Sequence, residues 1–235
     1  MRILFVGDSL TEALPGCSYV DRVCHSLPQV ECFNLGLRND TVISLTKRLE
    51  RSDLPRELDW VVVWVGVNDV PCNQHWSYRV GLQLLSVETA TDLATFEHWY
   101  QRLLALLKPL TRRIMVGSSM FKGENLPRPC NDQLDQQAVL IQRIARADPQ
   151  VTFLDIRSHL VSHLNGHRSA YRSPTAYKAL WEALTVRSQE RIDQLAAARR
   201  LQLTFDGLHL NSRGAELVAN LIVQAIESQT TPLDT

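Results

Sequence analysis

Five short apolar segments, separated by longer segments of a different period, constrain the fold of this chain most strongly. The apolar segments are continuous, which is typical of parallel strands buried on both faces of a sheet. They span Arg2 to Val6, Val30 to Leu35, Trp60 to Gly66, Arg113 to Ser118 and Val151 to Ile156. In the other segments apolar residues recur three and four positions apart, as on one face of a helix. These predicted helices span Tyr19 to Leu27, Thr41 to Arg51, Leu93 to Leu107 and Gln133 to Ala147.

Strands that alternate with long connections predict right-handed βαβ crossovers and hence a parallel sheet. We therefore predict an α/β fold with three layers, α/β/α, in which helices cover both faces of a five-stranded, mostly parallel sheet. A last helix, Gly214 to Ile226, is expected to pack back on the sheet. In such folds the ligand crevice lies beyond the carboxyl ends of the strands, so the residues that follow each strand are the candidate site residues.

Length and charge narrow the class of protein. A chain of 235 residues fits one domain, 1–235, and no linker or internal repeat divides it. Lysine plus arginine (25) balances aspartate plus glutamate (25), so no overall field attracts nucleic acid or an anionic membrane surface. No apolar stretch approaches the roughly 18 residues that a membrane span needs. We expect no nucleic-acid partner and no membrane span; the oligomeric state stays open.

The cysteines and the amino terminus bear on location. Five cysteines form an odd set without a C-x-x-C pair, which fits neither a disulfide framework nor a zinc ribbon. The first apolar run, Ile3 to Val6, is too short for a secretory leader. Reduced thiols and a cytoplasmic protein are therefore expected.

Three residues near the two ends of the chain have the chemistry of a nucleophilic triad. Ser9 follows the first strand, and Asp206 and His209 lie three residues apart in "DGLHLN" before the last helix. A serine becomes a nucleophile when a histidine takes its proton and a carboxylate orients that histidine. The alternative is that Ser9 is a turn residue or a helix cap, while Asp206 and Gly207 make a tight turn and His209 packs at a helix start.

Acyl transfer also needs donors for the negative charge that develops on the carbonyl oxygen. The backbone N–H of Ser9, the backbone N–H of Gly36 and the side-chain amide of Asn68 follow neighbouring strands and are candidates for this oxyanion hole. Gly7 and Gly36 lack a Cβ and would let a substrate approach the backbone closely. Alternatively, Gly36 is a turn glycine and Asn68 forms an Asx turn.

Four short blocks together resemble the SGNH, or GDSL, hydrolases. They are "GDSL" at 7–10, "NLG" at 34–36, "GVND" at 66–69 and "DGLHLN" at 206–211, in the order of the family. The resemblance implies a flavodoxin-like fold without a metal or organic cofactor. It also implies Ser9 as nucleophile, His209 as general base and acid, Asp206 as its orienting carboxylate, and Gly36 and Asn68 beside the Ser9 amide in the oxyanion hole.

The chain departs from the pattern of this family in two places. Where many members have a second glycine in the second block, this chain has Asn39, a residue that tolerates the left-handed conformation. The stretch 157–203 is longer than in compact members and resembles a helical insertion with a long helix, Thr175 to Arg200. It would be a lid that lowers Tyr177, Leu180 and Trp181 over the crevice, a dimer contact or an extra surface helix.

Other polar and aromatic residues have competing interpretations. His159, His163 and His167 recur every four residues, and we favour structural or solvent-facing roles over a metal site. Trp60 and Trp64 are expected in the core, whereas Trp76 is a candidate for the substrate pocket. Asp8 and Asp69 are expected to hold loops by accepting backbone N–H bonds.

The sequence thus predicts a serine hydrolase that cleaves carboxylic esters or thioesters of small molecules through a Ser9 acyl-enzyme. The resemblance includes enzymes for sugar acetates, lysolipids, thioesters and aryl esters, and the motifs do not choose among them. The alternative is a catalytically silent module that binds an acylated sugar or peptide in the same crevice.

Overall fold

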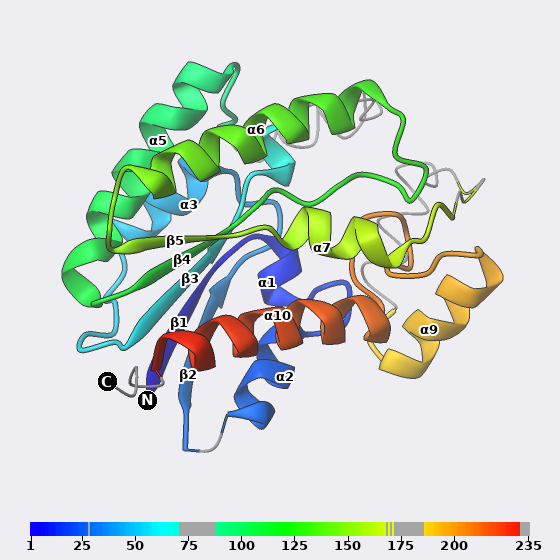
Figure 1. Cartoon of the computed structure of the whole chain (residues 1–235), viewed down its shortest axis with the longest axis horizontal. Helices are drawn as coiled ribbons and strands as arrows, with labels where there is room; N and C mark the ends of the chain where they lie inside the picture. The colour runs from blue at the N-terminus through cyan, green and yellow to red at the C-terminus, as the bar shows by residue number, and fades with distance from the viewer. Residues whose placement is uncertain (28, 71–87, 168, 170, 172–185, 231–235) are drawn as a thin grey trace.

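A five-stranded parallel sheet forms the centre of the molecule (Figure 1). The computed structural model describes residues 1–27, 29–70, 88–167, 169, 171 and 186–230. The strands have the order β2-β1-β3-β4-β5. Their bounds are β1 Arg2–Gly7, β2 Glu31–Gly36, β3 Trp60–Trp64, β4 Ile114–Gly117 and β5 Val151–Leu154. This is the flavodoxin-like order, and it confirms the predicted fold class.

Helices cover both faces of the sheet, as Figure 1 shows. On one face lie α3 (Val42–Leu49), α5 (Leu93–Leu107) and α6 (Pro129–Arg146). The other face carries α2 (Tyr19–Ser26), α7 (Ile156–His163) and α10 (Ser212–Thr230), with α9 (Gln189–Ala198) beyond the sheet edge. A short helix, α1 (Ser9–Glu12), and two 3₁₀ turns, η1 (Val67–Asp69) and η2 (Lys108–Leu110), complete the described elements.

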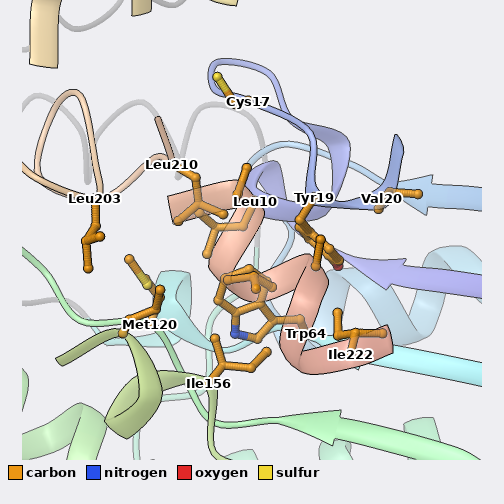
Figure 2. Close-up of a cluster of buried hydrophobic side chains, with 14 of the residues drawn as sticks. Leu10, Cys17, Tyr19, Val20, Trp64, Met120, Ile156, Leu203, Leu210 and Ile222 are labelled. Atoms are coloured by element: carbon orange, nitrogen blue, oxygen red, sulfur yellow. The ribbon is translucent and has the colours of Figure 1, made fainter. Parts of the chain in front are cut away.

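Alternate residues of each strand enter two separate cores, as a parallel sheet buried on both faces requires. In β1, Leu4 and Val6 pack against α3 and α5, whereas Ile3 and Phe5 pack on the side of α2 and α10. Trp64 lies in the second core, edge-on to Tyr19 at 5.4 Å between ring centroids (Figure 2). Trp60 and Trp64 are each 1% exposed, which confirms their prediction as core residues.

Side-chain caps explain where several helices begin. The side chains of Ser18, Thr41, Asp92 and Ser188 each accept a hydrogen bond from a backbone N–H of the following helix, as N-cap residues do. The Ser188 cap corrects the prediction of one helix over Thr175 to Arg200. The chain is not helical at Val186 and Arg187, and α9 begins at Gln189. Residues 175–185 of that prediction lie outside the described residues.

The expectation of uniformly reduced cysteines is wrong for one pair. Cys24 of α2 and Cys32 of β2 form a disulfide, with Cα atoms 6.3 Å apart. The packing of α2 against β2 brings the two cysteines within the usual Cα distance for a disulfide, which their spacing of eight residues does not reveal. Cys17 and Cys130 are buried free thiols, and Cys72 lies outside the described residues.

The described parts of 157–203 belong to the core on one face of the sheet. Leu160 of α7 and Ile192 of α9 are both buried in the cluster that also contains residues of α10. The residues expected to form a lid, Tyr177, Leu180 and Trp181, lie outside the described residues. None of the helices in the described ranges has both the length and the apolar character needed to cross a membrane.

Candidate active site

Ser9 stands at the carboxyl edge of the sheet because β1 ends at Gly7 and the chain turns at once into α1. Asp8 caps this helix, and its Oδ1 accepts a hydrogen bond from the Leu10 N–H at 2.9 Å. Leu10 of α1 is buried in the core and anchors the helix there. Ser9 is buried, with 6% of its surface exposed.

Asp206 and His209 lie in a tight turn before α10, which we call the histidine turn (residues 202–211). An antiparallel bridge between Thr204 and Leu210 forms its base, and the Phe205 N–H donates to the His209 carbonyl at 3.0 Å. Leu203 and Leu210 point from it into the same apolar cluster as Leu10 and Met120 (Figure 2). The turn is therefore anchored to the core beside α1.

Within the histidine turn, the Asp206 carboxylate orients the imidazole. Its Oδ1 accepts the N–H groups of Leu208 at 2.9 Å and His209 at 2.8 Å. Its Oδ2 lies 2.7 Å from His209 Nδ1. The other ring nitrogen, Nε2, is 2.9 Å from Ser9 Oγ. The structure thus brings together three side chains that the sequence separates by up to 200 residues.

In this pair, the attraction between the two charges and the burial of the side chains have opposite effects on each pKa. Burial alone would raise the pKa of Asp206, but the positive charge of His209 and the hydrogen bonds from it and from Leu208 outweigh burial and lower that pKa. Burial likewise would lower the pKa of His209, but the Asp206 carboxylate, with a smaller contribution from Asp8, raises it. The arrangement favours a negative Asp206 beside an imidazole that readily accepts a proton.

The expected oxyanion donors differ in their surroundings. The Gly36 N–H donates to Asn34 Oδ1 at 2.9 Å, so without substrate it is already engaged inside β2. The Asn68 side chain donates to the Asp40 carbonyl at 2.9 Å through its Nδ2 atom, which carries a second hydrogen. Asn39, in the turn before Asp40, has φ = 66°, so it adopts the left-handed conformation that asparagine tolerates better than most residues.

Gly7 and Gly36 are required for a reason other than substrate approach. A Cβ at Gly7 would lie 2.2 Å from Thr11 Oγ1, and one at Gly36 would lie 2.3 Å from the Glu12 backbone nitrogen. The missing side chains therefore make room for α1, which carries Ser9. This corrects the expectation that these glycines open the backbone to a substrate.

Two buried carboxyl groups support the edge of the sheet, as expected for Asp8 and Asp69. Asp69 accepts the N–H groups of Val42 at 2.9 Å and Ala90 at 3.2 Å, which ties η1 to α3 and to the segment before α5. Burial raises the pKa of both Asp8 and Asp69 to about 7. The nearby Lys122 partly offsets this effect, and its Nζ donates to the Val70 carbonyl at 3.0 Å.

Glu124, in the loop between β4 and α6, supports the site although no sequence motif marks it. This side chain is 1% exposed and accepts hydrogen bonds from residues 202–204 of the histidine turn. Apart from its position after a strand, nothing in the sequence singles it out, because backbone N–H groups that lie nearly eighty residues away leave no motif.

The three predicted histidines contact other parts of the chain. The rings of His159 and His163 on α7 meet edge to face with centroids 4.7 Å apart, and His167 Nε2 contacts the Arg200 carbonyl at 2.8 Å. Across the described ranges, no three histidine, cysteine, aspartate or glutamate side chains are grouped so that they could hold a metal ion. Trp76 lies outside the described residues.

The chain is similar in sequence to a known protein family and to a characterised relative. The family model described as "GDSL-like Lipase/Acylhydrolase family" matches residues 5–217. An acetylxylan esterase of Geobacillus stearothermophilus is 26% identical over 179 residues, which are 66% of this chain and 78% of the relative.

Solved structures share the fold. A crystal structure of an acetylxylan esterase from Geobacillus stearothermophilus has a TM-score of 0.66 at 19% identity, covering 96% of this chain and 93% of the other. A member of the lipolytic protein G-D-S-L family from Veillonella parvula has a TM-score of 0.65 at 13% identity, covering 97% and 98%.

Proposed function

Because the chain belongs to the GDSL-like lipase/acylhydrolase family, we propose that it is a serine hydrolase that cleaves esters through an acyl-enzyme on Ser9. The observation that carries this proposal is the contact of 2.9 Å between Ser9 Oγ and His209 Nε2, with Asp206 at the other ring nitrogen. Nucleophile, base and orienting acid are then all within hydrogen-bond reach.

In the first half of the reaction, Ser9 Oγ attacks the carbonyl carbon of the ester while its proton passes to His209 Nε2. Asp206 stays ionised and stabilises the imidazolium that forms. The tetrahedral intermediate collapses, its carbon–oxygen bond to the leaving group breaks, and His209 Nε2–H protonates the departing alcohol. The acyl group remains on Ser9.

In the second half, a water molecule gives a proton to His209 Nε2 and attacks the acyl-enzyme. Collapse returns the proton to Ser9 Oγ and releases the carboxylic acid. Asn68 can use one amide hydrogen to hold the Asp40 carbonyl and present the other to the oxyanion, next to the Ser9 N–H. Gly36 would contribute only if its N–H exchanged Asn34 for the substrate oxygen.

The curated relative supports a narrower choice of substrate. Since it is named an acetylxylan esterase, we propose that a short acyl group on a carbohydrate is the substrate to test first. Lysolipids, thioesters and aryl esters remain in the comparison set. We also propose that Trp76 lines the substrate pocket, that residues 1–235 form a single domain and that the protein is cytoplasmic.

The test is turnover of p-nitrophenyl acetate and acetylated xylo-oligosaccharides by the wild type and by Ser9→Ala. We expect Ser9→Ala to lose at least about 10³-fold in kcat, because removing the nucleophile leaves only binding and oxyanion stabilisation. Ser228→Ala on α10, whose hydroxyl donates to the Ala225 carbonyl of the same helix at 3.0 Å, is the matched control and should keep full activity. Substantial hydrolysis by a folded Ser9→Ala would refute the proposal.

A silent module that binds an acylated sugar or peptide is the second candidate, but the family match does not favour it. It predicts that both the wild type and Ser9→Ala bind acetylated oligosaccharide and that neither hydrolyses it. Calorimetry with the same oligosaccharide, followed by analysis of released acetate, separates the two functions.

A further inference from the structure

The loop between β4 and α6 holds the histidine turn through a single buried carboxylate. Glu124 Oε1 accepts hydrogen bonds from the Leu203 N–H at 2.8 Å, the Thr204 N–H at 2.9 Å and the Thr204 hydroxyl at 2.8 Å. Its Oε2 accepts the Gln202 N–H at 2.6 Å. Four donors therefore converge on one side chain that is 1% exposed.

The Glu124 carboxylate accepts the backbone N–H groups of residues 202–204, as the carbonyls of a neighbouring strand would in a sheet. Residues 202–204 form the first arm of the histidine turn, and their N–H groups would otherwise be buried without acceptors, which is costly. Thr204 is only two residues before Asp206, so the position of the Asp206 carboxylate follows from that of this arm. The second arm is closed by Asn211, whose N–H and side-chain amide donate to the carbonyls of Leu203 and Gln202, each at 3.0 Å.

A second contact between the same two segments lies at the tip of the turn. The Gly123 N–H donates to the Gly207 carbonyl at 2.6 Å. Gly207 has φ = 91°, and a Cβ there would lie 3.4 Å from Gly123 Cα. The loop therefore contacts the histidine turn both before Asp206 and between Asp206 and His209.

The loop itself is anchored on its other side. Asn131 of α6 is 2% exposed and accepts the Lys122 N–H at 2.8 Å through Oδ1. Its Nδ2 donates to the Leu126 carbonyl at 2.9 Å and to the Lys122 carbonyl at 3.3 Å. Glu124 thus projects from a loop that Asn131 holds in place, so its carboxylate can fix the position of the histidine turn.

We propose that Glu124 is a positioning residue for ester cleavage, which sets the Asp206–His209 pair against Ser9 by fixing residues 202–204. The inference rests on the proposed function of Ser9 and His209. Within the described part of the chain, the hydrogen bonds of Glu124 go to residues 202–204 and not to Ser9, so it acts through the histidine turn.

Glu124→Gln tests this role with almost unchanged volume. The amide keeps one acceptor oxygen but turns an NH₂ group toward backbone N–H donors, so at least one bond to residues 202–204 is lost. We expect kcat for p-nitrophenyl acetate to fall by about 10²-fold, the size of effect that a misplacement near 1 Å can cause. KM should stay within about twofold, since the hydrogen bonds of Glu124 go to the histidine turn and its side chain is 1% exposed.

A spectroscopic readout reports the geometry without substrate. In the wild type, the proton shared by His209 Nδ1 and Asp206 should give a resolved low-field ¹H NMR signal, and Glu124→Gln should weaken it or move it upfield. The control is Gln150→Leu, which removes two loop bonds at the opposite edge of the sheet, from Nε2 to the carbonyls of Lys108 and Thr111. It should lower the melting temperature yet leave kcat and the low-field signal unchanged.

Thr204→Val provides the test if Glu124→Gln does not fold. It keeps the shape of the side chain and removes one of the four donors to Glu124, so a smaller loss of kcat and a smaller shift of the same signal are expected. The positioning role would be overturned if folded Glu124→Gln kept the wild-type kcat and the wild-type low-field signal. If only Thr204→Val folds, the same result in that variant would overturn it. If the wild type itself fails to react at Ser9, the proposed function has failed instead.

Discussion

At the scale of residues, the site depends on how a negative Asp206 offsets the burial of His209. Both side chains are largely covered, and burial alone would move each toward its neutral form. Their contact of 2.7 Å reverses both tendencies. The pKa of His209 is therefore raised above its ordinary value of 6.5, while that of Asp206 is lowered below 3.8.

This balance predicts the pH dependence of the reaction. His209 takes the proton of Ser9 only when its ring is neutral, so kcat/KM of the wild type should rise with pH through a midpoint above 6.5. Asp206→Asn removes the carboxylate that raises this pKa, although Asp8 still contributes. We expect the midpoint to move to lower pH and kcat to fall by about 10⁴-fold, because the amide favours the wrong tautomer.

The measurement is kcat/KM for p-nitrophenyl acetate from pH 5 to pH 9. Asp193→Asn is the control, since Asp193 accepts the Ser212 N–H at 3.0 Å at the start of α10 and is not among the groups that shift the pKa of His209. Its profile should match that of the wild type. A midpoint for Asp206→Asn equal to or above the wild-type midpoint would contradict the electrostatic account.

Residues of the site differed in how far the sequence could predict them. Ser9, Asp206 and His209 could be named because their chemistry depends on residue type and their blocks form a pattern. Glu124 could not, since any chain segment can offer backbone N–H groups to a carboxylate. The Gly36 N–H was assigned to the oxyanion hole from the same pattern, which does not reveal that Asn34 lies within 2.9 Å.

At the scale of elements, α1 is the part of the fold that turns a strand end into a candidate nucleophile. It packs over Gly7 and Gly36, so its backbone lies where side chains of β1 and β2 would otherwise point. Asp8 caps it, and Leu10 secures it in the core. The position of Ser9 at its first residue therefore depends on the absence of a Cβ in two neighbouring strands.

Gly36→Ala should displace this helix. The added Cβ would lie 2.3 Å from the Glu12 nitrogen and 2.6 Å from the Thr11 carbonyl carbon, and neither backbone atom can rotate away. We expect the free energy of unfolding to fall by roughly 1–3 kcal/mol, as for other overpacked sites. Labelling of Ser9 by a fluorophosphonate should slow by at least about tenfold, because α1 carries the nucleophile.

Gly117→Ala is the control that separates a loss of stability from a displacement of α1. Its Cβ would meet the side chains of Ile156 and Trp64 at 2.7 and 2.8 Å, so it also crowds the core but does not touch α1. Chemical denaturation and labelling kinetics of the two variants give the comparison. If Gly36→Ala is destabilised yet labels at the wild-type rate, the position of α1 does not depend on this glycine.

The elements themselves followed closely from periodicity, except where a cap or a tertiary contact decided the boundary. The prediction of Leu93 to Leu107 coincides with α5, and the other long helices differ by a few residues at their ends. The predicted helix over Thr175 to Arg200 failed because its apolar spacing continues through Ser188, whose side chain caps a new helix. The disulfide of Cys24 and Cys32 depends on how α2 packs on β2, and local sequence does not specify this packing.

At the scale of the whole molecule, the strand order explains why residues from both ends of the chain meet. The connections from β1 to β2 and from β3 to β4 leave the centre of the sheet in opposite directions, so the switch point, where folds of this kind bind ligands, lies beyond β1 and β3. Ser9 follows β1 and Asn68 follows β3, and the histidine turn lies over the same edge before α10 returns along the sheet (Figure 1). The fold class was predictable because alternation and connection length admit few topologies.

The most direct test of the account is to map the site of fluorophosphonate modification in the intact wild-type protein by tandem mass spectrometry. The account predicts one adduct per chain, on Ser9, with no adduct in Ser9→Ala and slower formation in Asp206→Asn. An unmodified wild-type protein, or an adduct on a serine other than Ser9, would contradict it.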